Sequence, residues 1–442
     1  MNNHVFYINL NQDYPVVDRG KGIYLWDHKG KKYIDGCSGA LISNIGHGVS
    51  EIKEAMVSQL EKTEFAHRFR FTNSPVQQLA KKIYDITPEG IKWVSFVSGG
   101  SEAIETAMKM AREYFVEKGK PSKYKIISRW QSYHGYTLGA LSIGGNMWRR
   151  RRHGPLLVDF PHVRPPYCYR CPFGKKSENC GLDCAKDIEA AIVNEGPENV
   201  AAVILEPVSG SSLGAVVPKN GYMQSVREIC NKYDVLLIAD EVMSGIGRTG
   251  KYFAVEHWNV IPDIICMAKG LGSGYSPLGA VAVQDFIHKT FKEGSGKFSH
   301  GFTSSGNPVS AAAGLAVLNY IDKNNLVRNS YEVGKYLMEQ LKLIKDKYWF
   351  IGDVRGLGLM TGVEFVKNKE TKETFEPSEG ITDKIINAAF EKGLILFAAP
   401  LCADGTKGDA IMIAPPLIVT KQEVDEILTI FEEVLSCTFG SK

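Results

Sequence analysis

The sequence lacks several features that would assign it to a large class of proteins. No stretch of its 442 residues approaches the roughly 18 uninterrupted apolar residues of a membrane-spanning helix. The N-terminus shows no basic segment followed by an apolar one, so a secretory leader is not indicated. The formal net charge is only +3, and the one basic run, residues 149–152, has no interleaved aromatic residues and is expected to be a solvated face. We therefore expect a cytoplasmic protein that binds neither membranes nor nucleic acid.

Cysteine is sparse and odd in number. The nine cysteines are spread thinly through a large chain, which argues against a disulfide framework and for reduced thiols. Four of them cluster, at Cys168, Cys171, Cys180 and Cys184. Their paired short spacings resemble a structural zinc site, but the loop between the pairs is shorter than in common zinc modules. A loop of reduced thiols is the other interpretation, and we predict no metal ligands.

What the sequence does contain is an alternation of short apolar runs and helix-length segments. With 44% hydrophobic and 23% charged residues, the composition is that of a globular protein. The apolar runs are continuous, as expected for parallel strands buried on both faces; they are residues 93–97, 125–127, 203–205, 235–239, 264–267 and 280–283. This pattern predicts a doubly wound α/β domain.

The two ends of the chain have a different pattern. Helix-like segments at residues 331–342 and 422–435 flank strand-like runs at 361–365 and 393–397, which predicts a smaller α+β domain. Residues 22–26 and 32–34 predict a β-hairpin that joins this small domain. The expected organisation is an N-terminal segment that joins the small domain (1–60), a large domain (61–320) and a C-terminal small domain (321–442).

Lys269 ends one of the apolar runs and is followed by glycines. A buried lysine is costly unless it is neutralised or paired, so a lysine at the end of a core strand often serves as a reactive amine, for example in a Schiff base. A lysine that reaches from a strand end into solvent is the other interpretation. The residue alone leaves both open, and its neighbours along the chain favour the first.

Other functional side chains also follow predicted strands, at the edge where α/β sheets bind ligands. They are Gly100 and Ser101 at a helix N-terminus, Tyr133, His134, Glu206 and Asp240. The Gly-Gly-Ser turn exposes backbone N–H groups that suit a phosphate. An aldehyde-bearing pyridine cofactor with a phosphate arm needs such a cradle, together with an amine, a stacking aromatic ring and a carboxylate at the ring nitrogen. The set therefore points to pyridoxal 5'-phosphate.

The order of these motifs resembles the class III, or omega, aminotransferases of the pyridoxal-phosphate-dependent fold type I. The resemblance spans nearly the whole chain, and its motifs are Ser98-Gly99-Gly100-Ser101-Glu102-Ala103, Tyr133-His134-Gly135, Glu206-Pro207, Ala239-Asp240-Glu241-Val242, Ala268-Lys269-Gly270, residues 300–308 and Ala414-Pro415-Pro416-Leu417. It implies a large domain with a mostly parallel seven-stranded sheet and a smaller α+β domain.

The resemblance also implies roles for individual positions. Lys269 resembles the lysine that holds the cofactor and moves the substrate proton, and Asp240 resembles the partner of the pyridinium nitrogen. The other matching positions are Tyr133 and Val242 on the two faces of the ring, Gly100 and Ser101 at the phosphate, and His134 and Glu206 near the cofactor. Thr303 resembles a threonine that reaches the phosphate from the neighbouring subunit, which implies a homodimer with shared active sites.

Two positions depart from many relatives. Relatives with ornithine-like, acetylornithine-like or 4-aminobutyrate-like donors carry an arginine paired with a glutamate where this chain has Met412 and Ser211, and no arginine follows Arg355. Relatives that act on β-alanine, taurine or simple amines lack the pair too. The resemblance thus implies transfer from an omega-amino acid, a taurine-like donor or an amine to pyruvate or 2-oxoglutarate by a ping-pong mechanism. Lys407 is a candidate for the group that binds the substrate carboxylate.

Two alternatives remain open from the sequence. A racemase or epimerase of the same family would need a second acid or base besides Lys269, for which His134 or Tyr133 is available. A nucleotide-binding protein would use the glycine-rich residues 270–274 or 294–297, but Phe298 stands where a phosphate loop needs serine or threonine.

Overall fold

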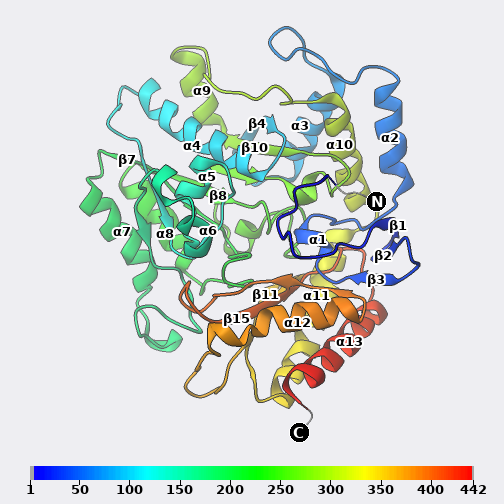
Figure 1. Cartoon of the computed structure of the whole chain (residues 1–442). Coiled ribbons are helices and arrows are strands. Elements are labelled where there is room, and N and C mark those ends of the chain that lie inside the picture. Colours follow the sequence, from blue (N-terminus) through cyan, green and yellow to red (C-terminus); the bar gives the residue numbers. More distant parts are fainter. Residues whose placement is uncertain (1–3, 441–442) are drawn as a thin grey trace.

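The computed structural model describes residues 4–440 and is organised around a seven-stranded sheet (Figure 1). The strands lie in the order β4 (Ile91–Val97), β10 (Gly279–Gln284), β9 (Ile264–Met267), β8 (Leu236–Asp240), β7 (Val200–Leu205), β5 (Lys125–Arg129) and β6 (His162–Val163). Neighbouring strands are parallel from β9 to β6, whereas β10 runs antiparallel to both β9 and β4. The predicted α/β class with a mostly parallel seven-stranded sheet is confirmed.

Each of the six apolar runs forms a strand of this sheet. Every residue of β7, β8 and β9 is buried, as the continuous apolar sequence requires. The reversed direction of β10 could not be foreseen, because a buried antiparallel strand has the same apolar sequence as a parallel one. The seventh strand, β6, has only two residues and carries no strand pattern.

Helices cover both faces of the sheet. Leu236 and Ile238 of β8 pack in the same hydrophobic cluster as α4 (Gly100–Glu117), whereas Leu237 and Ala239 pack in the cluster that contains α8 (Tyr222–Lys232). This alternation is the two-residue period of a strand. The other helices of this region are α2 (Ser50–Leu60), α3 (Ser74–Ile86), α5 (Leu138–Ile143), α6 (Met147–Arg151), α7 (Asp183–Glu195), α9 (Asp285–Glu293) and α10 (Pro308–Lys323).

Asparagine caps set the start of two of these helices. The Asn73 side chain accepts a hydrogen bond from the N–H of Val76 at 3.0 Å, and Pro75 occupies the first turn of α3. Asn307 does the same for α10, accepting from the N–H of Ser310 at 2.9 Å. Both arrangements satisfy backbone donors that have no partner inside the helix.

Two four-stranded sheets are built from the chain ends. One has the order β1 (Val17–Lys21), β2 (Tyr24–Asp27), β3 (Lys32–Asp35), β13 (Leu394–Ile395), and it contains the predicted hairpin as the antiparallel pair β2 and β3. The other has the order β11 (Ile351–Leu357), β12 (Met360–Phe365), β15 (Asp409–Ile413), β14 (Phe397–Ala398). The short turn α1 (Ser38–Leu41) follows the hairpin.

The prediction of a single strand over residues 393–397 was wrong. The chain leaves one sheet after β13 and enters the other at β14, with only Leu396 between them. β13 pairs in parallel with β3, so the N-terminal hairpin and the C-terminal chain share a sheet. The boundaries at residues 60 and 320 remain predictions.

Three further helices complete the C-terminal part, namely α11 (Leu326–Lys347), α12 (Ile381–Glu391) and α13 (Lys421–Phe439). They lie beside the small sheets at the bottom of Figure 1. Short 3-10 turns lie at Gly154–Leu156, Ser177–Asn179, Ala254–Trp258, Lys269–Leu271 and Pro377–Glu379. Among the helices of residues 4–440, none combines the length and the apolar composition that a bilayer-spanning segment requires.

Candidate functional site

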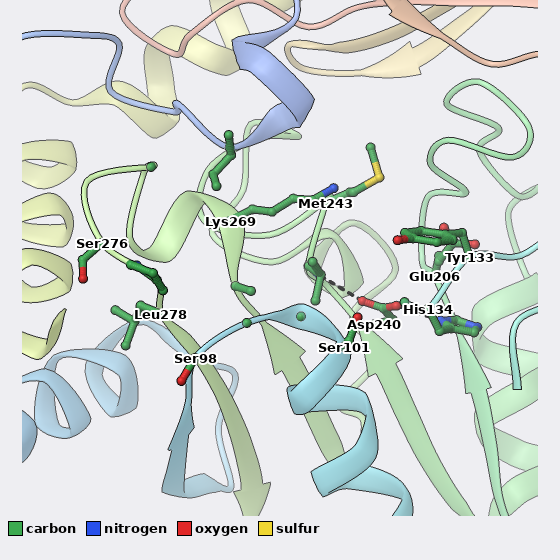
Figure 2. A pocket seen from close by; sticks show the side chains of 18 of the residues that line it. Ser98, Ser101, Tyr133, His134, Glu206, Asp240, Met243, Lys269, Ser276 and Leu278 are labelled. Atoms are coloured by element: carbon green, nitrogen blue, oxygen red, sulfur yellow. Dashed lines mark hydrogen bonds and ion pairs between the residues drawn. The ribbon is translucent and has the colours of Figure 1, made fainter. Parts of the chain in front are cut away.

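A cavity of about 440 Å³ lies at the carboxyl ends of the central strands (Figure 2). Parallel strands end at the same edge of a sheet, so residues that are distant in sequence meet there. The sequence-predicted residues that line the cavity are Gly100, Ser101, Tyr133, His134, Glu206, Asp240, Val242 and Lys269. The residues predicted from the strand ends thus lie together in one cavity.

One end of the cavity is formed by the N-terminus of α4. The helix begins at Gly100, and its first backbone N–H groups have no partner within the helix. A Cβ atom on Gly100 would come within 2.9 Å of a methyl group of Val242, and one on Gly135 would come within 2.3 Å of Ser101 Oγ. These glycines therefore keep open a space that a side chain would fill. Ser101 Oγ itself accepts a hydrogen bond from the N–H of Tyr136 at 3.0 Å.

Asp240 forms the floor of the cavity together with His134. His134 Nδ1 lies 2.7 Å from Asp240 Oδ2, and Asp240 Oδ1 accepts a hydrogen bond from the N–H of Val242 at 3.1 Å. His134 is almost fully buried, and its Nε2 lies 3.3 Å from Ser128 Oγ. Both ring nitrogens of His134 therefore face protein groups, and the imidazole holds the carboxylate in place.

Lys269 follows β9 and extends into the cavity, which Met243 also lines (Figure 2). Its backbone has a φ of 41°, in the left-handed region that non-glycine residues rarely adopt. Burial lowers the pKa of Lys269 to about 8, although the carboxylates of Asp240 and Glu206 act in the opposite direction. Near neutral pH about a tenth of the amine is therefore unprotonated and nucleophilic, far more than for a lysine with the ordinary pKa.

Glu206 is buried on the same wall with an unusual set of partners. Its Oε1 accepts a hydrogen bond from the N–H of Gly210 at 3.1 Å, while its Oε2 has no hydrogen-bond partner within residues 4–440. Arg129 Nη2 lies 3.9 Å from Oε2 and donates to the Glu206 carbonyl at 2.7 Å. Burial raises the pKa of Glu206, and the charges of His134 and Arg129 oppose that rise. The free oxygen is available to a ligand.

Tyr133 closes the side of the cavity and is covered by Arg149 of α6. The Arg149 guanidinium lies 4.4 Å from the centre of the Tyr133 ring, 4.8 Å from that of Trp148 and 5.3 Å from that of Tyr136. The expectation of a solvated face at residues 149–152 was therefore wrong for Arg149, because two of the rings come from another part of the chain. It holds for Arg151 and Arg152, which are exposed.

Among the described residues, Thr303 is the one predicted cofactor-binding residue that this cavity does not include. It lies on an exposed loop between α9 and α10. Arg68 ties the neighbouring residues of this loop to another segment, donating to the carbonyls of His300 and Phe302 at 3.4 and 3.5 Å. The role of Thr303 in a partner's site remains a prediction.

The two positions that differ from many relatives, Met412 and Ser211, both have uncharged side chains. Met412 lies fully buried in β15, and Ser211 is buried with a hydroxyl that has no partner within the described chain. Lys407 is exposed and lines a second cavity, together with Cys168 and Arg170, rather than the cavity of Lys269. The structure thus separates Lys407 from the residues with which it was expected to act.

Of the cysteine cluster, Cys168, Cys171 and Cys180 lie in a partly exposed loop, and Cys184 lies in the first turn of α7. All nine cysteines are free thiols, and burial raises the pKa of Cys184 to about 11. Within residues 4–440, no three histidine, cysteine, aspartate or glutamate side chains come together in a way that could hold a metal ion.

Several residues that line the cavity were missed from the sequence. They are Ile42, Val208, Met243, Ser276, Pro277 and Leu278. Most are apolar and look like ordinary core residues, so composition gave no signal. Ser276 and Pro277 precede β10, which runs antiparallel to β9. They therefore lie at the start of a strand, whereas only residues at strand ends were predicted to line the site.

The cavity fits the cofactor expected from the sequence, pyridoxal phosphate. The space kept open by Gly100 and Gly135 at a helix N-terminus suits a phosphate. The fixed carboxylate of Asp240 suits a protonated ring nitrogen, and the free Glu206 oxygen suits a further polar group of the ring. The Lys269 amine lies in the same cavity and would hold the aldehyde.

Comparison with known proteins gives one consistent result. The family model for class-III aminotransferases matches residues 7–435. The uncharacterized aminotransferase YodT of Bacillus subtilis is 42% identical and covers 99% of this chain and 98% of its own length. The putrescine–pyruvate aminotransferase of Pseudomonas aeruginosa is 37% identical over 96% of this chain and 91% of its own. The crystal structure of an (S)-enantioselective omega-transaminase from Thermomicrobium roseum superimposes with a TM-score of 0.92 at 37% identity, covering 99% of this chain and 96% of that one.

Proposed function

The chain belongs to the class-III aminotransferase family, and on that premise we propose that it moves the amino group of an omega-amino acid, a taurine-like donor or a simple amine to pyruvate or 2-oxoglutarate. The observation that carries the donor class is the pair of uncharged, buried side chains at Met412 and Ser211. Relatives that use ornithine-like donors carry an ion pair there.

Enzymes of this family depend on pyridoxal phosphate, which supplies an electron sink for the carbon that loses or gains the amino group. The chain's own residues supply the rest. Gly100 and Ser101 would hold the phosphate, and Asp240 would place a negative charge at the ring nitrogen. The Lys269 amine would hold the aldehyde of the cofactor, and as a free amine it would take up and give back the proton of the donor carbon, for which its lowered pKa is suited.

The proposed reaction has two halves. The donor leaves its amino group on the enzyme and departs as a carbonyl compound, after which the 2-oxo acid enters the same site and takes the group away. Double-reciprocal plots at several acceptor concentrations are then parallel. The test is a donor screen with pyruvate and with 2-oxoglutarate, comparing taurine, β-alanine, putrescine, simple amines and α-amino acids. Turnover confined to α-amino acids would contradict the proposed donor class.

The covalent role of Lys269 has a spectroscopic test. We expect the purified protein to absorb near the violet end of the visible spectrum after incubation with pyridoxal phosphate. Lys269→Ala should abolish this band, whereas Lys297→Ala, which changes an exposed lysine, should keep it. A persistent band in the Lys269→Ala protein would exclude this residue as the attachment point.

A homodimer with shared active sites is part of the proposal. Large apolar side chains lie exposed beside the loop of Thr303, since Phe69 is 75% and Phe71 is 68% accessible and Arg68, which precedes Phe69, contacts that loop. A second copy of the chain would cover this surface. We also propose that the enzyme acts in the cytoplasm.

The racemase alternative receives less support from the geometry. His134, a candidate second acid or base, has both ring nitrogens engaged by Asp240 and Ser128. Incubation with single-enantiomer alanine distinguishes the two functions. If chirality is lost in the absence of any 2-oxo acid, the enzyme racemises.

A further inference from the structure

The proposed donors include amino acids with a distant acid group, and the positions that bind such a group in many relatives are uncharged here. Several arginines elsewhere in the chain have their charge or donors already in use. Arg355 is already paired, with Asp353 at 2.9 Å and with Glu364 at 2.7 Å, and it donates to the carbonyl of Gly214 at 2.8 Å. Its charge is therefore not available to a substrate.

Two more arginines are fixed by the fold. Arg248 is fully buried and donates to backbone carbonyls, among them that of Pro415 at 2.6 Å, and to the side chain of Asn44 at 2.7 Å. Arg129 is buried behind Glu206, and its Nη2 donates to the Glu206 carbonyl at 2.7 Å and to Ser209 Oγ at 3.3 Å, although its Nε and Nη1 have no hydrogen-bond partner within the described residues. Neither can turn towards a substrate without breaking buried hydrogen bonds.

Two of the arginines of α6, Arg149 and Arg150, differ sharply in their contacts. Arg150 donates to the carbonyls of Leu141 at 3.0 Å and Gly144 at 2.7 Å, and it serves the local fold. Arg149 makes one side-chain hydrogen bond, from Nη1 to the hydroxyl of Tyr136 at 2.8 Å. Within residues 4–440, no carboxylate lies at ion-pair distance from it, and its shielded Nε has no hydrogen-bond partner. Its donors therefore remain available.

The surroundings of Arg149 prepare it for an anion. Three aromatic rings, those of Tyr133, Tyr136 and Trp148, hold the flat guanidinium. A guanidinium held in this way is weakly hydrated and loses little conformational freedom when it binds a carboxylate through two hydrogen bonds. The shielded Nε also has an unsatisfied N–H, which costs desolvation free energy. An acceptor on a bound ligand would remove this cost.

Arg149 lies just outside the cavity that contains Lys269. Tyr133 lines that cavity, and Arg149 covers its ring. The positive charge of Arg149 also lowers the pKa of Lys269. A substrate whose amino group is at Lys269 and whose chain passes the edge of the Tyr133 ring therefore brings its far end to Arg149.

We propose that Arg149 binds the distal acid group, carboxylate or sulfonate, of the amino donor and so selects omega-amino acids over uncharged amines. This inference rests on the proposed aminotransferase function. Arg149 takes the part that an arginine at position 412 has in other members of the family. It acts from the opposite part of the chain, beside the stacking tyrosine.

The test compares donors of equal length with and without the acid group. The pyridoxal-phosphate-loaded enzyme is mixed, without acceptor, with β-alanine, 4-aminobutyrate or 6-aminohexanoate, or with the n-alkylamine of the same chain length. The rate of change of the visible absorbance is followed against donor concentration. We expect Arg149→Met to raise the half-saturating concentration of the best amino acid about 10- to 100-fold, the size expected for loss of a charge-assisted hydrogen-bonded pair. The matching alkylamine should change less than about twofold.

Three further variants sharpen the result. Arg149→Lys keeps the charge and should recover part of the affinity for the amino acid. Tyr136→Phe removes the hydrogen bond that orients Arg149 and should give a smaller loss of the same kind. Arg151→Gln removes a nearby exposed charge and should behave as wild type. As a readout without turnover, calorimetry on the loaded enzyme should show that Arg149→Met weakens the binding of pentanoate.

The outcomes separate this inference from the proposed function. An equal loss for amino acids and alkylamines in Arg149→Met would mean that Arg149 only supports Tyr133, and it would overturn the inference. A wild-type enzyme that accepts alkylamines but no omega-amino acid would overturn it as well. A wild-type enzyme that transfers no amino group from any donor would instead overturn the proposed function.

Discussion

His134 and Asp240 are joined by a hydrogen bond of 2.7 Å beneath the cavity, although 106 positions separate them in the sequence. The imidazole and the N–H of Val242 together leave the Asp240 carboxylate with a fixed orientation. A buried carboxylate held in this way is a pre-organised negative charge, which is effective because it does not have to reorient during the reaction.

Replacing this charge should be costly for activity. In Asp240→Asn we expect the rate of amino transfer to fall about 10²- to 10³-fold, the range seen when a pre-organised electrostatic group is removed. Single-turnover absorbance measurements on the loaded enzyme would report it directly. Asp234→Asn, which changes an exposed carboxylate paired with Lys120, is the matched control and should retain activity. A rate within a few-fold of wild type would show that Asp240 is structural only.

The pKa of Lys269 predicts the pH dependence of cofactor capture. Only the neutral amine attacks an aldehyde, so the rate at which cofactor-free protein takes up pyridoxal phosphate should rise about tenfold per pH unit. The rise should level off above pH about 8, the pKa to which burial lowers this amine. Stopped-flow absorbance between pH 6 and 10 checks it. Arg149→Met should move the midpoint upward, because the Arg149 charge lowers this pKa.

The same shift has a defined effect on stability. Folding lowers the pKa of Lys269 from 10.5 to about 8, so between these values the unfolded chain holds a proton that the folded chain has lost. The contribution of Lys269 therefore increases the free energy of unfolding as the pH rises through this window, and below it the cost of burying the ammonium is fully present. A continued rise in the capture rate up to pH 10 would contradict both statements.

Gly135 should be essential for cofactor affinity. It has a φ of 140°, and a Cβ atom would lie 2.3 Å from Ser101 Oγ at the phosphate end of the cavity. We expect Gly135→Ala to weaken pyridoxal phosphate binding at least about tenfold, because either the backbone or Ser101 must move. Equilibrium dialysis would measure the dissociation constant. Gly119→Ala also replaces a glycine of positive φ, but no atom lies within 4 Å of its Cβ position, and it should bind the cofactor normally.

Shared active sites predict complementation between inactive subunits. If Thr303 acts in the neighbouring subunit's site, a mixed dimer of Lys269→Ala and Thr303→Ala chains contains one site with both native residues. Mixing the two variants under conditions of subunit exchange should therefore give more activity than the sum of the separate preparations. Activity that stays at that sum would place Thr303 in its own chain's site or remove it from the site altogether.

The reactive residues could be predicted from the sequence because they follow the ends of apolar strands. Asp240 and Lys269 each end a continuous apolar run, and a charge in that position is costly unless it is used or paired. Glu206 follows the same logic. These residues could be assigned to one site without knowing which strands pair, because parallel strands end at a common edge of the sheet.

Other parts of the site and fold gave no such signal. The sequence predicted a solvated face for Arg149. The prediction failed because Tyr133 and Tyr136, whose rings contact Arg149, are brought to it only by tertiary folding. Leu278 and Met243 line the cavity, but they are apolar and resemble core residues. The split of one apolar run between two sheets at Leu396 depends on pairing with β3 and β15, and no local pattern encodes these partners.

That split joins the two ends of the chain mechanically. One residue spans at most about 3.6 Å, so β13 and β14, separated only by Leu396, cannot move apart. The N-terminal segment is fastened a second time where the Ser38 hydroxyl donates to the carbonyl of Ala414 at 2.8 Å. Ile42, a few residues further on, lines the cavity of Lys269. A rotation of the C-terminal sheets against the central sheet would thus move Ile42 together with those sheets. This movement would widen or narrow the entrance for substrate.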